Sequence, residues 1–250
     1  MARVKLWSIA VPAAVVLIGI VVASYLSVEA TAIVTGAAAA LAGFGWPYLL
    51  GVPARKTQGG VLAFVGAGSV AAAYLAPATS MLTWLPAFTA VGVGSVFLIQ
   101  LLRGTGQAHR LESTIGVIGG ALISGMASGW VAADRLPAPE GSYGLITASG
   151  AAILSAILVC LIPLPDRITA PFAVVAGAVA GGAAAALVPG LPVAAGAVIG
   201  AVCAGVIAAV RRLALTRDEA PGLLGVLSAG LAPVLALGTA VYFAGRLLIP

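Results

Sequence analysis

Apolar stretches of about 20 residues recur along the whole chain, and the charged residues lie in the short segments between them. The 250 residues are 62% hydrophobic and 8% charged, whereas soluble domains are about 45–50% apolar and about 25% charged. Twelve basic and seven acidic side chains are too few to cover the surface of a soluble protein of this length. The composition therefore excludes a cytosolic enzyme, a disordered chain and a secreted disulfide-bonded scaffold, and it indicates a polytopic membrane protein.

The apolar stretches predict an all-α membrane bundle. A spanning helix needs about 20 mostly apolar residues, because the hydrocarbon core is about 30 Å thick and each residue rises about 1.5 Å. By this criterion nine helices are expected, at residues 7–26, 32–51, 59–76, 81–102, 114–133, 143–162, 169–187, 193–210 and 222–247. They leave only short connections, so we expect one transmembrane helical domain over residues 1–250. The segment 188–192 predicts a tight hairpin, with one long broken helix as the alternative.

The basic residues divide unequally between alternate connecting segments. The outer set has only Arg135 and Arg246, and the inner set has the other ten: Arg3, Lys5, Arg55, Lys56, Arg103, Arg110, Arg167, Arg211, Arg212 and Arg217. Because Lys and Arg collect in cytoplasmic loops, this division predicts a cytoplasmic N-terminus and a C-terminus outside. The net charge of +5 therefore reports topology in the cell (inner) membrane, and no nucleic-acid partner is expected.

Small residues recur at four-residue spacing in several predicted helices. This spacing lets helix backbones approach closely, so we expect close packing inside the bundle, with a homodimer face or a substrate path as the alternatives. The glycines are Gly116, Gly120, Gly125, Gly129, Gly177, Gly181, Gly196 and Gly200. Pro47, Pro86 and Pro233 fall inside predicted helices and are expected to bend them, because proline removes a backbone hydrogen bond.

Ionisable side chains are absent from the middle of every predicted span. The acidic residues lie in loops or at helix ends, and the single histidine, His109, lies in a loop. Carriers that couple transport to ions commonly keep an acidic group at this depth, so the sequence disfavours that class. It also has no nucleophile elbow, phosphate-binding Gly-Lys loop or paired-histidine metal motif. We therefore expect no catalytic residue, metal ligand or cofactor.

Two predicted cytoplasmic loops carry clustered arginines that can contact anionic lipid headgroups. Arg103 and Arg110 flank the most polar stretch of the chain, and Arg211, Arg212 and Arg217 follow the eighth predicted helix. The alternative is that these arginines serve only as topology signals.

The second of these loops resembles the C-terminal signature of the phosphatidate cytidylyltransferases, also called CDP-diglyceride synthases. Arg211 and Arg212 match the basic pair of that family, and Arg217 with Asp218 matches its Lys-Asp. Pro221 and Gly222 match its Pro-Gly after a shortened gap. The resemblance implies a lipid-binding membrane scaffold, and the helix order and chain length are also similar to those of the family.

The chain departs from that signature at the positions that would carry the chemistry. Ala208 replaces the serine, Leu223 the histidine and Leu224 a glycine, while Ser228 and Leu231 replace the two acidic residues. In the family those acids hold the divalent metal that neutralises the triphosphate of CTP. The resemblance therefore implies a scaffold that has lost cytidylyl transfer.

Three functional hypotheses follow. The first is a non-catalytic integral membrane protein that binds lipid or a partner protein. The second is an uncoupled permease or flippase, whose uncharged polar contacts would be Trp46, Tyr48, Thr89, Ser95, Ser124, Ser128, Thr147, Ser149 and Ser155. The third is an enzyme that uses His109 and Glu112 with the arginine-bearing loops. A homo-oligomer or a membrane-protein partner is compatible with each of them.

Overall fold

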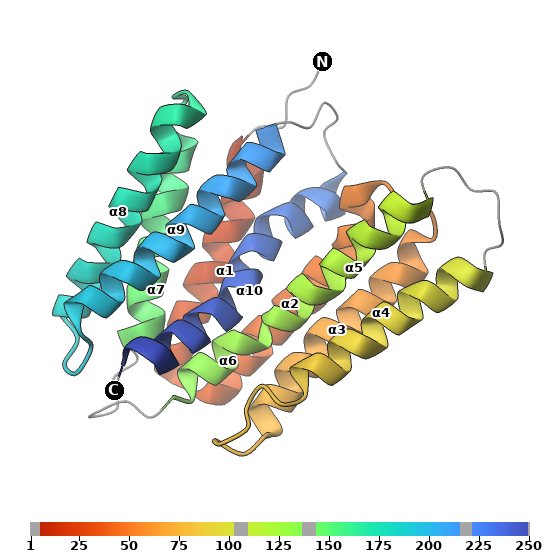
Figure 1. Cartoon of the computed structure of the whole chain (residues 1–250), viewed down its shortest axis with the longest axis horizontal. Coiled ribbons are helices and arrows are strands. Elements are labelled where there is room, and N and C mark those ends of the chain that lie inside the picture. The colour runs from red at the N-terminus through yellow and green to blue at the C-terminus, as the bar shows by residue number, and fades with distance from the viewer. Residues whose placement is uncertain (1–5, 103–109, 137–143, 216–221, 250) are drawn as a thin grey trace.

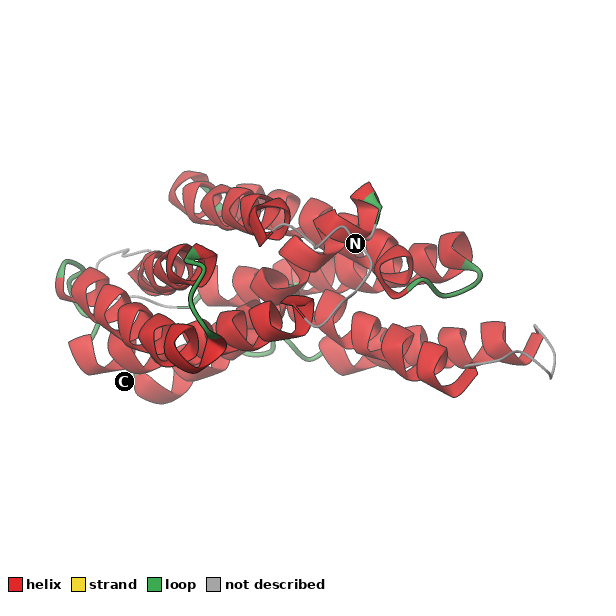
Figure 2. Ribbon diagram, turned by 90° about the horizontal axis from the view of Figure 1, so that it is seen from above, coloured by secondary structure: helices red, strands yellow, loops and turns green. Residues whose placement is uncertain are grey.

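A computed structural model describes residues 6–102, 110–136, 144–215 and 222–249, and these residues form helices joined by short loops, with no strand among them (Figure 2). The helices are α1 (Leu6–Leu26), α2 (Val28–Leu50), α3 (Arg55–Leu75), α4 (Leu85–Leu102), α5 (Arg110–Met126), α6 (Ser128–Asp134), α7 (Gly144–Leu161), α8 (Asp166–Ala186), α9 (Val193–Leu215) and α10 (Leu223–Leu248). Within the described ranges nine segments are long and apolar enough to cross a membrane, because α5 and α6 together form one span. The predicted all-α membrane bundle is thereby confirmed.

The helices form two groups on either side of a central helix (Figure 1). Helices α7, α8 and α9 pack together on one side, and α2, α3, α4 and α5 pack together on the other. Helix α10 runs between the groups and contacts α1, α2, α5, α6, α7 and α9. Its neighbours α1 and α6 complete the core, where Leu17, Trp130, Ile153 and Leu235 are fully buried.

Local turn chemistry explains where adjacent helices separate. Ser27 alone joins α1 to α2, and its hydroxyl accepts a hydrogen bond from the Ala30 amide at 3.1 Å, which caps the start of α2. Gly51 ends α2 with a φ of 68°, in the left-handed region that glycine adopts without a steric penalty. The tight hairpin predicted at residues 188–192 is confirmed, since α8 and α9 pack against each other and Gly190 in the connection has a φ of 80°.

Glycines allow helix backbones to touch at the centre of the α8–α9 pair. A Cβ atom on Gly181 would lie 2.4 Å from the Gly196 carbonyl oxygen, and one on Gly200 would lie 2.2 Å from the Gly177 oxygen. Such separations are shorter than carbon–oxygen contacts allow, so any side chain here would force the two helices apart. At Gly205, which lies away from this contact, the nearest side-chain atom is 4.0 Å from where a Cβ atom would lie.

The prediction of one continuous helix over residues 114–133 is wrong at Ala127, where α5 ends and α6 begins. Hydroxyl groups bind the carbonyls on one side of the break: Thr239 Oγ1 donates to Met126 at 2.8 Å, and Ser128 Oγ donates to Gly125 at 2.8 Å. Helix α6 packs against α10. There the Trp130 indole N–H donates to the Val234 carbonyl at 2.9 Å.

The three prolines occupy different positions within their helices. Pro233 lies inside α10, as expected, and Pro47 lies in the last turn of α2. The fourth predicted helix begins later than expected, at Leu85 instead of residue 81, because residues 77–84 form turns. Pro86 is therefore in the first turn of α4, where its missing N–H breaks no intrahelical hydrogen bond. The expectation that it bends the helix interior is wrong.

Candidate functional site

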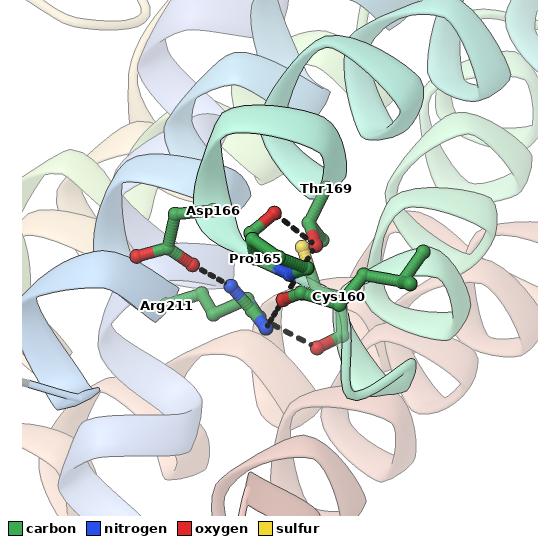
Figure 3. Close-up of polar contacts among 6 residues, drawn as sticks. Cys160, Pro165, Asp166, Thr169 and Arg211 are labelled. Atoms are coloured by element: carbon green, nitrogen blue, oxygen red, sulfur yellow. Dashed lines mark hydrogen bonds and ion pairs between the residues drawn. The ribbon is translucent and has the colours of Figure 1, made fainter.

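Arg211, near the end of α9, joins that helix to the turn between α7 and α8 (Figure 3). Its Nε donates to the Cys160 carbonyl at 2.8 Å, and its Nη2 donates to the Leu164 carbonyl at 3.3 Å. Its Nη1 forms an ion pair with the Asp166 carboxylate. The Arg211 side chain is only 7% exposed, so its planar donors fix the turn from within the protein.

Thr169 strengthens the same turn from the α8 side. Its hydroxyl lies within hydrogen-bond distance of the Leu164 carbonyl at 3.1 Å and of the Pro165 carbonyl at 3.2 Å (Figure 3). Asp166 is the first residue of α8, where an acidic side chain also interacts favourably with the helix dipole. The turn is thus held by side chains from α8 and α9, and the start of α8 has a fixed position beside the end of α9.

A groove with a volume of about 1130 Å³ lies between the start of α8 and the end of α9. Three arginines, Arg167, Arg211 and Arg212, border it together with Asp166. The remaining lining is apolar and mostly small: Pro165, Ala170, Pro171, Val174, Gly205, Ala208, Ala209 and Leu213. The groove therefore combines a basic rim with an apolar wall. A phospholipid is divided in a matching way, into a charged headgroup and apolar acyl chains.

The charges on the rim are not equivalent. Arg211 is neutralised by Asp166, whereas Arg167 and Arg212 are exposed and have no ion-pair or hydrogen-bond partner in the described part of the chain. The rim consequently has an excess of two positive charges that face the solvent.

A small apolar cavity of about 60 Å³ lies on another side of Arg211, among α1, α7, α9 and α10.

The structure describes the side chains of two of the five arginines predicted as lipid contacts. Arg211 and Arg212 line the groove, but most of the Arg211 donors are bound within the protein. Arg103 and Arg217 lie outside the described residues, and Arg110 begins α5, with its side chain also outside the description. Helix α5 belongs to the other group of helices (Figure 1).

Asp166 and Arg167 are the groove residues that sequence reasoning missed as site residues. From the sequence alone, both are only charged residues near a helix end. A signal was present, because Pro-Asp-Arg stands shortly before the helix predicted over residues 169–187, and proline with an acidic residue is typical of the first turn of a helix. The pairing of Asp166 with Arg211 joins residues 45 positions apart, and no local pattern contains that information.

Ser228 and Leu231, which the sequence resemblance aligns with two acidic residues of the cytidylyltransferase signature, lie inside the bundle. Ser228 is fully buried and its hydroxyl donates to the Ala42 carbonyl at 2.7 Å, while Leu231 belongs to the apolar core. Across the described residues, no group of three or more His, Cys, Asp or Glu side chains comes together. Cys160 and Cys203 are buried free thiols.

Several of the uncharged polar side chains considered for a permeation path bind backbone groups. The hydroxyls of Ser128, Ser149 and Ser155 donate to carbonyls of nearby residues, and the Trp46 indole donates to the Gly116 carbonyl at 2.8 Å. These bonds join or stabilise helices. A different polar group, the fully buried amide of Gln58 in α3, has no hydrogen-bond partner in the described part of the chain.

Comparison of the chain with protein-family models, with curated proteins and with solved structures finds no match.

Proposed function

We propose that this chain is a non-catalytic integral membrane protein that binds an anionic phospholipid in the groove between α8 and α9. The observation that supports this most directly is the pair of unpartnered arginines, Arg167 and Arg212, at the rim of a groove with an apolar wall. Guanidinium groups bind phosphate through paired N–H donors, so these side chains suit a phosphate headgroup.

The apolar part of the groove suits an acyl chain of the same molecule. Ala170, Gly205 and Ala209 have small side chains or none, which leaves space between α8 and α9 on the side away from the tight glycine contact. The groove lies on two helices that are mostly exposed in the bundle, so a lipid can reach it laterally. In this proposal Arg211 is a positioning residue that sets the shape of the groove.

The resemblance of the Arg211–Arg212 pair to the basic pair of phosphatidate cytidylyltransferases supports the same ligand class. The proposed scaffold is cytidylyltransferase-like, with cytidylyl transfer lost at Ser228 and Leu231. The proposed location is the cell (inner) membrane, with the groove at the cytoplasmic surface, where anionic lipids concentrate.

Replacing Arg167 and Arg212 together with alanine is expected to weaken binding of an anionic phospholipid by about 30-fold. Each basic residue near a membrane surface contributes about 1 kcal/mol to the attraction, and about 1.4 kcal/mol is a tenfold change in affinity. Binding is measured on purified protein in neutral detergent by native mass spectrometry, with a titration of phosphatidylglycerol against phosphatidylcholine.

The matched control removes Arg55 and Lys56, two exposed basic residues at the start of α3, from the same end of the bundle. This variant is expected to retain most of the lipid binding. If both double variants lose affinity equally, general electrostatic attraction explains the binding and the groove is not the site.

The orientation of the bundle can be tested at two exposed positions, one in a loop and one in the first turn of a helix. We expect a membrane-impermeant maleimide to label an Ala78→Cys variant in intact cells, and a Thr57→Cys variant only after permeabilisation. Ala78 lies between α3 and α4, and Thr57 lies at the opposite end of α3. The native thiols are buried and give little background. The reverse labelling pattern would place the groove outside the cell and remove the argument from cytoplasmic anionic lipids.

A further inference from the structure

Helices α3, α4 and α5 pack against one another, and buried residues of all three meet at one level. A Cβ atom on Gly92 of α4 would lie 2.7 Å from Val65 Cγ2 of α3 and 3.2 Å from Ala121 Cβ of α5. Helix α4 runs in the opposite direction to α3 and α5 (Figure 1). Moving from this contact toward the start of α3 and of α5 is therefore the same as moving toward the end of α4.

The next buried residues in that direction are apolar. They are Leu62, Val96 and Val117, three or four positions from the contact on their helices. These residues pack in one cluster with Ala121 and with Val52, which lies in the connection between α2 and α3. This apolar layer closes the space between the three helices toward the middle of the bundle.

One further turn along each helix, the buried residues are polar. Gln58, Gln100 and Thr114 are 0%, 3% and 7% exposed, and each is seven or eight residues, about 10–12 Å, from the shared contact. The Gln100 Nε2 donates to Ser113 Oγ at 3.4 Å, which shows that α4 and α5 meet at this level. Gln58, Gln100 and Thr114 together form what we call the polar layer.

Gln58 is the member of the polar layer that has no hydrogen-bond partner in the described part of the chain. Both its Oε1 and its Nε2 are buried. Burying an amide without hydrogen bonds is costly, so this group indicates a ligand that supplies both a donor and an acceptor. The polar layer offers amide and hydroxyl groups and no charge, which favours an uncharged ligand.

We propose that the polar layer binds a small uncharged molecule that donates and accepts hydrogen bonds at Gln58. Water is the smallest molecule of this kind, and buried water typically binds to several buried polar groups at once. A solute with a carboxamide group matches Gln58 more closely, because two amides can exchange a pair of N–H···O bonds. The site is separate from the lipid groove, which lies between α8 and α9.

An open depression of about 640 Å³ at the connection between α2 and α3 borders this site. Two of its lining residues adjoin the layers described above: Thr57 precedes Gln58 in the chain, and Val52 packs against the apolar layer. The proposed ligand enters from this depression, at the start of α3, and the apolar layer stops it from passing further.

Access to the polar layer is measured with cysteine variants of the full chain in membranes. We expect Gln58→Cys to react with methyl methanethiosulfonate at least about tenfold faster than Leu62→Cys, because a thiol reacts as the thiolate, which forms where water or another polar ligand is present. Leu62 is the matched control, since it is equally buried, one turn further along α3 and in the apolar layer. The native thiols are buried and give little background. Equal rates for the two variants would overturn the proposal.

The sign of a stability change gives a second test. Methionine keeps the length of glutamine without its polar atoms, so Gln58→Met is expected to lower the unfolding temperature by about 2–4 °C, as for the loss of about one net hydrogen bond. An amide that is truly unpaired would have the opposite effect, because its removal stabilises the protein. The control, Leu62→Met, conserves volume and is expected to unfold close to the wild-type temperature. A rise in the unfolding temperature of Gln58→Met would contradict the proposed ligand.

Acetamide distinguishes the two sources of the ligand. A saturable rise of the wild-type unfolding temperature with acetamide, absent in Gln58→Met, would identify a carboxamide solute as the ligand. If Gln58→Met is destabilised and acetamide has no such effect on the wild type, the ligand is water.

Discussion

Replacing Gly129 with alanine is expected to destabilise the folded bundle by about 3 kcal/mol or more, the largest effect of any single methyl group considered for this chain. A Cβ at this position would lie 2.1 Å from the Thr239 nitrogen and 2.2 Å from the Gly238 carbonyl carbon. Both atoms belong to the backbone of α10, which cannot rotate away as a side chain can. The two helices must therefore separate, and the Trp130–Val234 hydrogen bond is strained with them.

The control for this variant is Gly119→Ala. Gly119 is in α5, part of the same membrane span, and no atom of a neighbouring element lies within 4 Å of its Cβ position. Its replacement is expected to change stability by less than about 0.5 kcal/mol. Stability is measured by SDS titration in mixed micelles, with size-exclusion chromatography to verify monodispersity. Equal stability of Gly129→Ala and the wild type would contradict the close contact between α6 and α10.

Replacing Arg211 with alanine is expected to destabilise the protein by about 3 kcal/mol, whereas Arg212→Ala should change stability by less than about 0.5 kcal/mol. The loss arises mainly from the Cys160 carbonyl, which loses a donor in a buried environment, and from the packing of the arginine side chain. The broken ion pair contributes less, because the Asp166 side chain is 38% exposed and water can solvate it.

The Arg211→Lys variant separates charge from geometry at this position. Lysine keeps the positive charge but has one nitrogen, so it cannot reach Cys160, Leu164 and Asp166 together. We expect it to recover only part of the lost stability in the same SDS titration. A complete recovery would show that charge, and not the planar group of donors, holds the turn between α7 and α8.

The helices could be predicted from the sequence because a membrane imposes length and apolarity on each span. Nine apolar segments and the hairpin at residues 188–192 follow from these two constraints. The break at Ala127 does not follow from these constraints. Ala, Gly and Ser surround it, and such residues continue a membrane helix as readily as they interrupt it. The break is stabilised by the hydroxyl of Thr239 on α10, which donates to the Met126 carbonyl from 113 positions further along the chain.

The candidate site could be predicted only in part, for a related reason. The positions of the charges in the sequence indicate that Arg211 and Arg212 are basic residues at one end of the bundle, but they do not distinguish a buried, hydrogen-bonded guanidinium from an exposed one. From the sequence, Asp134 is one of several acidic residues at the ends of predicted helices. Its carboxylate oxygens are buried in the structure, and this burial depends on contacts between helices that no local sequence pattern contains.

The break between α5 and α6 also has a consequence for biosynthesis. The Met126 carbonyl and the Trp130 indole have their partners on α10, which the ribosome completes only after α7, α8 and α9. Until α10 has inserted, the nascent protein exposes these polar groups within the bilayer, where unpaired groups are costly. A chain that stalls before α10 therefore differs from the finished protein at a position that a membrane quality-control protease or chaperone can recognise.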